Sequence, residues 1–160
     1  MEQIKRVQPG KYLILSSNGI SSLLFRFIFS NSKTSVFDFV LQGRYAYSSS
    51  GYYSKQDKDL ALQALSDLSI ESLAHRTLHS LSGGEYQKVR IARALTQSAP
   101  FVFLDEPAAN LDFVYEPKLL DMLKNLAHTK NLGILISIHD VNLAAEYADK
   151  MLLLPKNQTA

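Results

Sequence analysis

Residues 101–107 read Phe-Val-Phe-Leu-Asp-Glu-Pro, and this stretch decides the fold class. Its four apolar residues do not alternate with polar ones, which is typical of a strand buried on both faces of a parallel sheet. Pro107 cannot donate to a ladder, so the strand should end there and leave Asp105 and Glu106 at its carboxyl end, where open α/β sheets place ligand groups. One acid could hold Mg²⁺ through water and the other could deprotonate an attacking water. A polar cap on a core strand is the simpler alternative.

Apolar runs of the same kind follow at Ile134–Ile138 and Met151–Leu154. Apolar residues at steps of three and four predict helices between them, over Leu119–Leu126 and Val141–Ala148, and Asp140 is a plausible cap of the second helix. Strand, helix, strand, helix and strand in this order indicate two right-handed crossover units. The predicted fold class is therefore α/β, with a mainly helical segment from about residue 36 to residue 77.

Composition excludes several classes of protein. The 160 residues carry 17 Lys and Arg against 15 Asp and Glu, and a net charge of +2 is too small to demand nucleic acid or an anionic membrane as partner. The Tyr- and Ser-rich stretch Tyr45–Lys55 has too few nearby cations for a nucleic-acid groove, so we expect a surface loop. Cysteine is absent, which excludes disulfides and thiolate chemistry. No apolar run approaches the roughly 18 residues of a membrane span, and no signal peptide is evident, so we expect a soluble, intracellular chain.

Two further motifs carry chemistry. Leu81-Ser82-Gly83-Gly84-Glu85 places two glycines directly before an amphipathic helix, whose exposed N–H groups and dipole make a natural phosphate site. A glycine-rich helix start without a ligand is the alternative. His139 follows the run Ile134–Ile138 and could donate a hydrogen bond to a phosphate, although a lone histidine is more often structural.

Taken together and in this order, these motifs resemble the ATP-binding cassette (ABC) ATPases over Leu81 to about Leu154. Val36–Tyr45 resembles the entry to the helical subdomain in the branch that imports iron–siderophore complexes, haem and cobalamin. The resemblance implies a role for each matching residue: Ser82, Gly83, Gly84 and Glu85 as the signature loop on the nucleotide, Asp105 as the metal acid that holds Mg²⁺ through water, Glu106 as the general base, Asn110, Leu111 and Asp112 in the D-loop, and His139 as the switch histidine.

The phosphate-binding loop departs from the family's pattern. Tyr12–Leu15 should be the preceding strand, and Ser16 stands where the family has its first loop glycine. The Gly-Lys pair that should follow Ile20 is missing, and no lysine occurs between Lys11 and Lys33. By resemblance, the remaining loop residues on the nucleotide are Asn18, Gly19, Ser21 and Ser22. An ordinary strand–turn–helix without nucleotide is the alternative at this site.

The interval from Phe25 to Ser35 is also too short for the family's glutamine-bearing loop. We therefore expect a truncated P-loop NTPase-like cassette with a mainly parallel sheet flanked by helices. The whole chain, residues 1–160, should form one shortened domain, with the core sheet in about 1–35 and 100–160 and the helical subdomain and signature helix in about 36–99.

The resemblance implies an ATP-binding and ATP-hydrolysing subunit of an importer for iron chelates, haem or cobalamin, with ATP and Mg²⁺ as cofactors. Its partners would be a second ATPase subunit, identical or different, and transmembrane permease subunits, with no nucleic acid. It would lie on the inner face of the cell membrane as a cytoplasmic, peripheral protein. The alternatives are a non-hydrolysing subunit that lends only its signature loop to a partner, and a decayed remnant.

Overall fold

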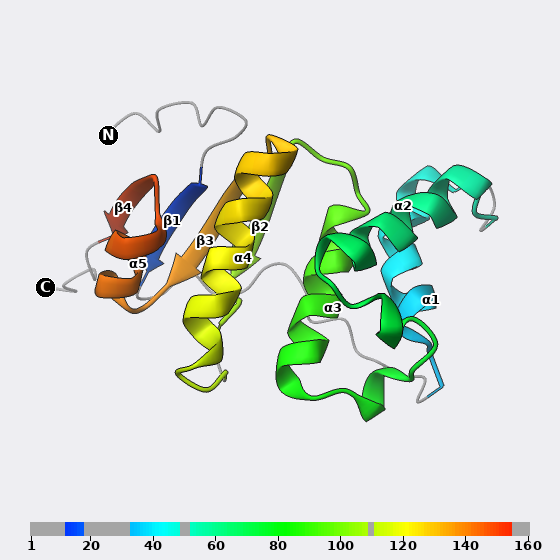
Figure 1. The fold of residues 1–160 in the computed structure, drawn as a ribbon. Coiled ribbons are helices and arrows are strands. Elements are labelled where there is room, and N and C mark those ends of the chain that lie inside the picture. The colour runs from blue at the N-terminus through cyan, green and yellow to red at the C-terminus, as the bar shows by residue number, and fades with distance from the viewer. Residues whose placement is uncertain (1–11, 18–32, 49–51, 109–110, 155–160) are drawn as a thin grey trace, which may run out of the picture. The chain divides into compact units, whose positions relative to one another are not determined.

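The computed structural model describes residues 12–17, 33–48, 52–108 and 111–154 (Figure 1). The chain divides into two compact units, one made of residues 1–26 and 100–160 and the other of residues 27–99. In the first unit the described strands form one sheet and two described helices accompany it (Figure 1). These elements are β1 (Tyr12–Ser17), β2 (Phe101–Asp105), α4 (Tyr115–Lys130), β3 (Gly133–Ile138), α5 (Val141–Tyr147) and β4 (Lys150–Leu154).

The sheet has the order β2-β3-β1-β4, and its strand pairs are all parallel. The predicted α/β class with a parallel sheet is therefore confirmed. In the register of β2 and β3, Asp105 is the partner of Ser137. The carboxyl ends of these two strands thus lie side by side, which brings the residues that follow them to one edge of the sheet.

The expectation of full burial is wrong for β2 and β4, the two end strands of the described sheet. In β4, Met151, Leu152 and Leu153 are 40%, 40% and 56% exposed. Val102 is buried, but its neighbours Phe101 and Phe103 are 36% and 57% exposed. Successive side chains of a strand point to opposite faces, so burial of one face of β2 leaves the other face with solvent contact. β2 is also an edge strand of the described sheet.

Helix α4 follows from the predicted spacing of apolar residues. Leu119, Leu120, Leu123 and Leu126 form its buried stripe. The helix ends at Asn131, whose left-handed backbone (φ 52°) terminates the helix. Helix α5 begins as predicted: the Asp140 carboxylate accepts hydrogen bonds from the N–H groups of Asn142 and Leu143. Neither these helices nor any other in the described ranges has the length and apolar content that a membrane crossing requires.

The second unit is helical, as predicted for this part of the chain. It contains α1 (Val36–Leu41), the 3-10 helix η1 (Gln42–Tyr47), α2 (Lys55–Asp67), the 3-10 turns η2 (Glu71–Leu73) and η3 (Leu78–Ser80), and α3 (Gly83–Leu95). Its core includes the fully buried Val36, Val40, Leu65 and Val89. Tyr45 and Tyr47 lie on the surface as expected, but in η1 rather than in an irregular loop.

Gly43 and Arg44 join η1 to the rest of this unit. A Cβ atom at Gly43 would lie 2.0 Å from Thr96 Oγ1 and 2.3 Å from the Arg93 carbonyl oxygen, so only glycine fits without a shift of backbone. Arg44 Nε donates to Asp57 Oδ1 over 2.8 Å, and Arg44 Nη1 donates to the Thr96 carbonyl over 3.1 Å. The Arg44 and Asp57 side chains are only 11% and 7% exposed. The ion pair therefore ties η1 to the start of α2.

Stability of the helical unit should depend on this pair at acidic pH. The hydrogen bond from Arg44, assisted by those from the hydroxyl and N–H of Ser54, lowers the pKa of Asp57 from 3.8 to about 2. Because the folded pKa is the lower one, this stabilisation is full above the unfolded pKa and is lost as the pH falls toward 2. We expect Asp57→Asn to lower the melting temperature at neutral pH and the difference from the parent to shrink between about pH 4 and pH 2. Thermal unfolding followed by circular dichroism across this range measures it.

Asp59→Asn is the matched control, since Asp59 is exposed on the same helix. It should leave the melting temperature and its pH dependence close to the parent. If the melting temperature of Asp57→Asn stays below that of the parent by the same amount down to pH 2, the charge of the Asp57 carboxylate does not have the stabilising role given to it.

Candidate functional site

The residues that end β2 and β3 form a cluster of acids, a hydroxyl and an imidazole. Asp105 is the last residue of β2 and Glu106 follows it, while Ser137 lies near the end of β3 and His139 follows that strand. Parallel pairing of the two strands brings all four side chains to one edge of the sheet. The structure therefore groups the three predicted residues Asp105, Glu106 and His139.

Ser137 connects the two acids. Its hydroxyl donates to Asp105 Oδ1 over 2.6 Å and accepts the backbone N–H of Glu106 over 2.8 Å. Glu106 has φ 43°, a left-handed conformation that L residues rarely adopt and that costs free energy. Asp105, Glu106 and Ser137 are thus fixed as one hydrogen-bonded group at the turn out of β2.

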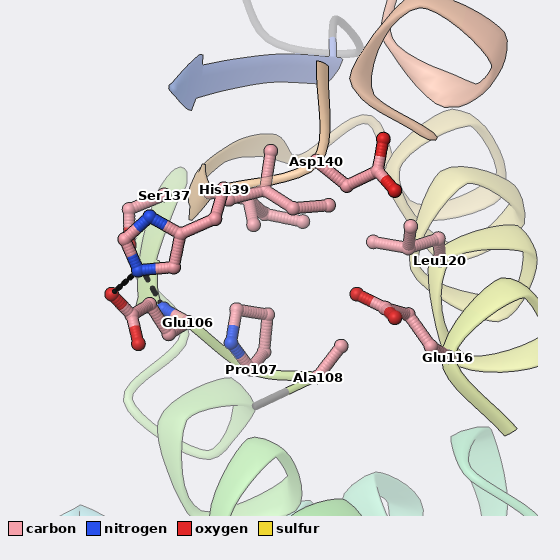
Figure 2. Close-up of a pocket in the computed structure, with 10 residues that line it drawn as sticks. Glu106, Pro107, Ala108, Glu116, Leu120, Ser137, His139 and Asp140 are labelled. Atoms are coloured by element: carbon pink, nitrogen blue, oxygen red, sulfur yellow. Dashed lines mark hydrogen bonds and ion pairs between the residues drawn. The ribbon is translucent and has the colours of Figure 1, made fainter. Parts of the chain in front are cut away.

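Glu106 and His139 meet at this edge. Glu106 Oε1 lies 2.5 Å from His139 Nε2, and the two side chains are 41% and 58% exposed (Figure 2). A carboxylate in contact with an imidazole can accept a proton, and the imidazole can donate a hydrogen bond. Both groups keep access to solvent, as residues that act on a bound ligand and a water molecule must.

A cavity of about 220 Å³ lies beside this pair. Figure 2 shows Glu106 and His139 directed at each other on one side of it, with Glu116 and Asp140 on the opposite side. Leu120 of α4 contributes to the apolar part of its wall. The carboxylates of Glu106, Glu116 and Asp140 thus border the cavity from three parts of the fold. Glu116 is a glutamate like Glu106, but it lies away from His139 (Figure 2).

The surroundings of the Asp105 carboxylate are suitable for a group that holds hydrated Mg²⁺. Its Oδ1 accepts from Ser137, and within the described ranges its carboxylate has no further hydrogen bond or ion pair. The side chain is exposed at the end of its strand. A carboxylate oxygen with solvent access is the kind of group that holds hydrated Mg²⁺, which retains several of its waters in proteins.

The signature-like motif lies in the helical unit. Ser82 is the N-cap of α3: its hydroxyl accepts the N–H of Glu85, and the Glu85 carboxylate accepts the N–H of Ser82. The hydrogen bond from the Ser82 N–H is the main reason why the pKa of Glu85 is lowered. The Arg76 guanidinium, 3.2 Å from the Glu85 carboxylate, lowers this pKa further. The space where Gly83 would carry a side chain is open: apart from its chain neighbours and its own helix backbone, no atom of the described residues lies within 4 Å. The start of α3 is therefore accessible, while the Glu85 side chain is engaged in the cap.

The other predicted residues are only partly described. Leu111 and Asp112, which the resemblance assigned to a D-loop, lie before α4, where the N–H of Tyr115 donates to Asp112 Oδ1 over 3.2 Å. Ser16 was expected to open the phosphate loop, but β1 continues through Ser17, because Ser16 pairs with β3 and both serines pair with β4. That boundary is wrong by two residues. The remaining predicted residues, Asn18, Gly19, Ser21, Ser22 and Asn110, lie outside the described residues.

Ser137 was not among the predicted site residues. A serine within an apolar strand, two residues before His139, was the available signal. Its partner becomes evident only from the register, which sets Ser137 beside Asp105.

Comparisons with known proteins place the chain among ABC transporter proteins. The ABC transporter family matches residues 9–109. The chain is 40% identical over 131 residues to the hemin import ATP-binding protein HmuV of Burkholderia ambifaria, covering 75% of this chain and 48% of that protein. It is 36% identical over 124 residues to the petrobactin import ATP-binding protein FpuD of Bacillus anthracis, covering 77% of this chain and 45% of that protein. The chain thus spans about half the length of these relatives.

Among solved structures, a chain of an ABC transporter described as of the metal-chelate type, in an inward-facing conformation, aligns with a TM-score of 0.80 and 29% identity. The alignment covers 93% of this chain and 70% of that chain. The order of motifs, the parallel sheet and the match over most of the chain agree, and this protein belongs to the ABC transporter family, with the fold of its ATP-binding cassettes.

Proposed function

We propose that this chain is the ATP-binding and ATP-hydrolysing subunit of an importer for iron chelates, haem or cobalamin. The observation that carries the proposal is the grouping of Asp105, Glu106 and His139, with 2.5 Å between Glu106 and His139. Such a group suits transfer of a phosphoryl group to water. The relatives HmuV and FpuD are named as ATP-binding proteins for the import of hemin and petrobactin, which supports the proposed class of transported compound.

Each residue has a separate task in this proposal. Glu106 orients the attacking water and accepts its proton. His139 donates a hydrogen bond to the terminal phosphate. Asp105 holds hydrated Mg²⁺, which neutralises phosphate charge when bound.

The proposed active state is a head-to-tail pair of cassettes. The whole chain, residues 1–160, forms one shortened cassette in this proposal, and residues 82–85 close over the nucleotide of a second ATPase subunit. Asn18, Gly19, Ser21 and Ser22 contact the nucleotide of the chain's own site, and Asn110, Leu111 and Asp112 lie at the junction of the subunits. Closure moves transmembrane permease subunits, with the pair peripheral on the inner, cytoplasmic face of the membrane.

A second candidate function rests on the contrast between two sites. The start of α3 is capped and open at Ser82 and Gly83, whereas no lysine is present between Lys11 and Lys33 to pair with phosphate. A subunit of this kind would complete a partner's nucleotide site without hydrolysing ATP at its own. Activity of mixed and unmixed subunits separates the two functions.

Binding of MgATP by the isolated chain tests the proposal directly. We expect weak, saturable binding in a calorimetric titration, because loss of one charge-assisted contact to phosphate costs about 1.5–3 kcal/mol, or one to two decades of affinity. Chelation of Mg²⁺ should weaken it further, since Asp105 then has no cation to share with the phosphates. Absence of binding at millimolar ATP would contradict the proposed function, and a micromolar dissociation constant would contradict the importance given to the missing lysine.

A further inference from the structure

We propose that Ser137 is a positioning residue that sets the geometry of Asp105 and Glu106 for hydrolysis; in this role it rests on the proposed function. Asp105 and Glu106 have different tasks, one toward the metal and the other toward water. Their side chains must therefore keep a fixed separation while the chain turns sharply between them. Ser137 is the group on the neighbouring strand that contacts both residues.

The hydroxyl of Ser137 acts as a hydrogen-bond donor and as an acceptor at the same time. It donates its hydrogen to Asp105 Oδ1 over 2.6 Å, which fixes the carboxylate in one rotation and leaves Oδ2 for the hydrated cation. It accepts the Glu106 N–H over 2.8 Å, which holds the peptide between the two acids (Figure 2). Hydrogen bonds to a charged acceptor are short and strong, so the donated bond is the stronger of the two.

Backbone strain at Glu106 explains why a second anchor is needed. At φ 43° the residue is in a conformation that persists only where its surroundings enforce it. The bond from its N–H to Ser137 supplies that constraint directly. The same conformation directs the Glu106 side chain to His139, so release of the N–H would also loosen the contact between Glu106 and His139.

The location of Ser137 makes this role specific. It is half-buried in β3, directly opposite Asp105 in the parallel register. An apolar residue of similar size would preserve the strand but offer neither the donor nor the acceptor. Valine and threonine are nearly the same in shape, and both suit a strand, so they form a matched pair that differs in the hydroxyl.

The first test is hydrogen exchange of the Glu106 amide in the chain without nucleotide, for the parent, Ser137→Thr and Ser137→Val. We expect exchange in Ser137→Val to be at least about ten-fold faster and Ser137→Thr to stay near the parent. Exchange of the Ile134 and Ile136 amides within β3 should be the same in all three, which shows that the strand is intact. Equal Glu106 exchange in Thr and Val variants overturns the proposal, whatever the outcome with nucleotide.

The second test is binding of Mn²⁺ with ATP, followed by electron paramagnetic resonance. We expect Ser137→Val to bind the ion about 10- to 100-fold more weakly and Ser137→Thr to bind it like the parent, because the hydroxyl fixes Asp105. Equal Mn²⁺ affinities for the two variants overturn the positioning role. If the parent itself binds no Mn²⁺ with ATP, the proposed function fails, while the exchange result still decides whether Ser137 holds the turn.

Discussion

Glu106→Gln is expected to reduce any ATP hydrolysis at the chain's own site by about 100- to 10,000-fold, the usual contribution of a general base. The amide keeps the size of the side chain and can still contact His139, but it cannot accept a proton. Binding of MgATP should therefore stay near the parent's value while turnover is lost. Steady-state turnover at saturating ATP, together with a calorimetric titration of the variant, measures both quantities.

Glu116→Gln is the matched control, because Glu116 lines the same cavity from α4 and does not contact His139 (Figure 2). It should leave turnover within about two-fold of the parent. His139→Ala should slow turnover by a smaller factor than Glu106→Gln, since it removes a donor to the phosphate and not the base. Similar rates for Glu106→Gln and the parent would show that another group accepts the proton.

Ser82→Arg is expected to abolish the ATPase activity gained when this chain is mixed with an intact cassette. In a head-to-tail pair the best site combines the partner's phosphate loop with Ser82 and the N–H groups at the start of α3. An arginine at the N-cap fills the open space beside Gly83, where the phosphate would lie. The measurement is turnover of the mixed pair compared with that of the partner alone.

Ser82→Ala separates obstruction from loss of the helix cap. Both substitutions remove the hydroxyl that accepts the Glu85 N–H, which costs about 1 kcal/mol of helix stability. Only arginine adds bulk and charge over the helix start, so the alanine variant should keep a substantial part of the gain. A gain that survives Ser82→Arg, or the absence of any gain on mixing, would favour the decayed remnant over both proposed functions.

Local patterns predicted the elements around the site well. The uninterrupted apolar runs marked β2, β3 and β4, and the spacing from Leu119 to Leu126 marked α4, because these signals depend on neighbours along the chain. The Asp140 cap followed from the same kind of local rule. Asp105, Glu106 and His139 could be predicted to lie close together, because the carboxyl ends of neighbouring parallel strands lie side by side.

Features that depend on distant pairing could not be predicted in the same way. β1 continues to Ser17 because β3 and β4 both pair with Ser16 and β4 pairs with Ser17, and no local signal shows this. The contact between Ser137 and Asp105 joins residues 32 positions apart and needs the register. The exposure of Phe101 and Phe103 on one face of β2 likewise depends on what packs against that face of the sheet, which the apolar run itself does not reveal.

The position of β2 as the outermost strand on one side of the described sheet affects the behaviour of the chain in solution. Residues 101–104 of β2 are apolar and include no lysine or proline, the residues by which edge strands usually avoid pairing with other molecules. Exposed phenylalanines beside backbone groups that no other described strand pairs with favour self-association that increases with protein concentration. Phe103, more than half exposed, is the position at which a charged side chain would protect this edge with the least loss of packing.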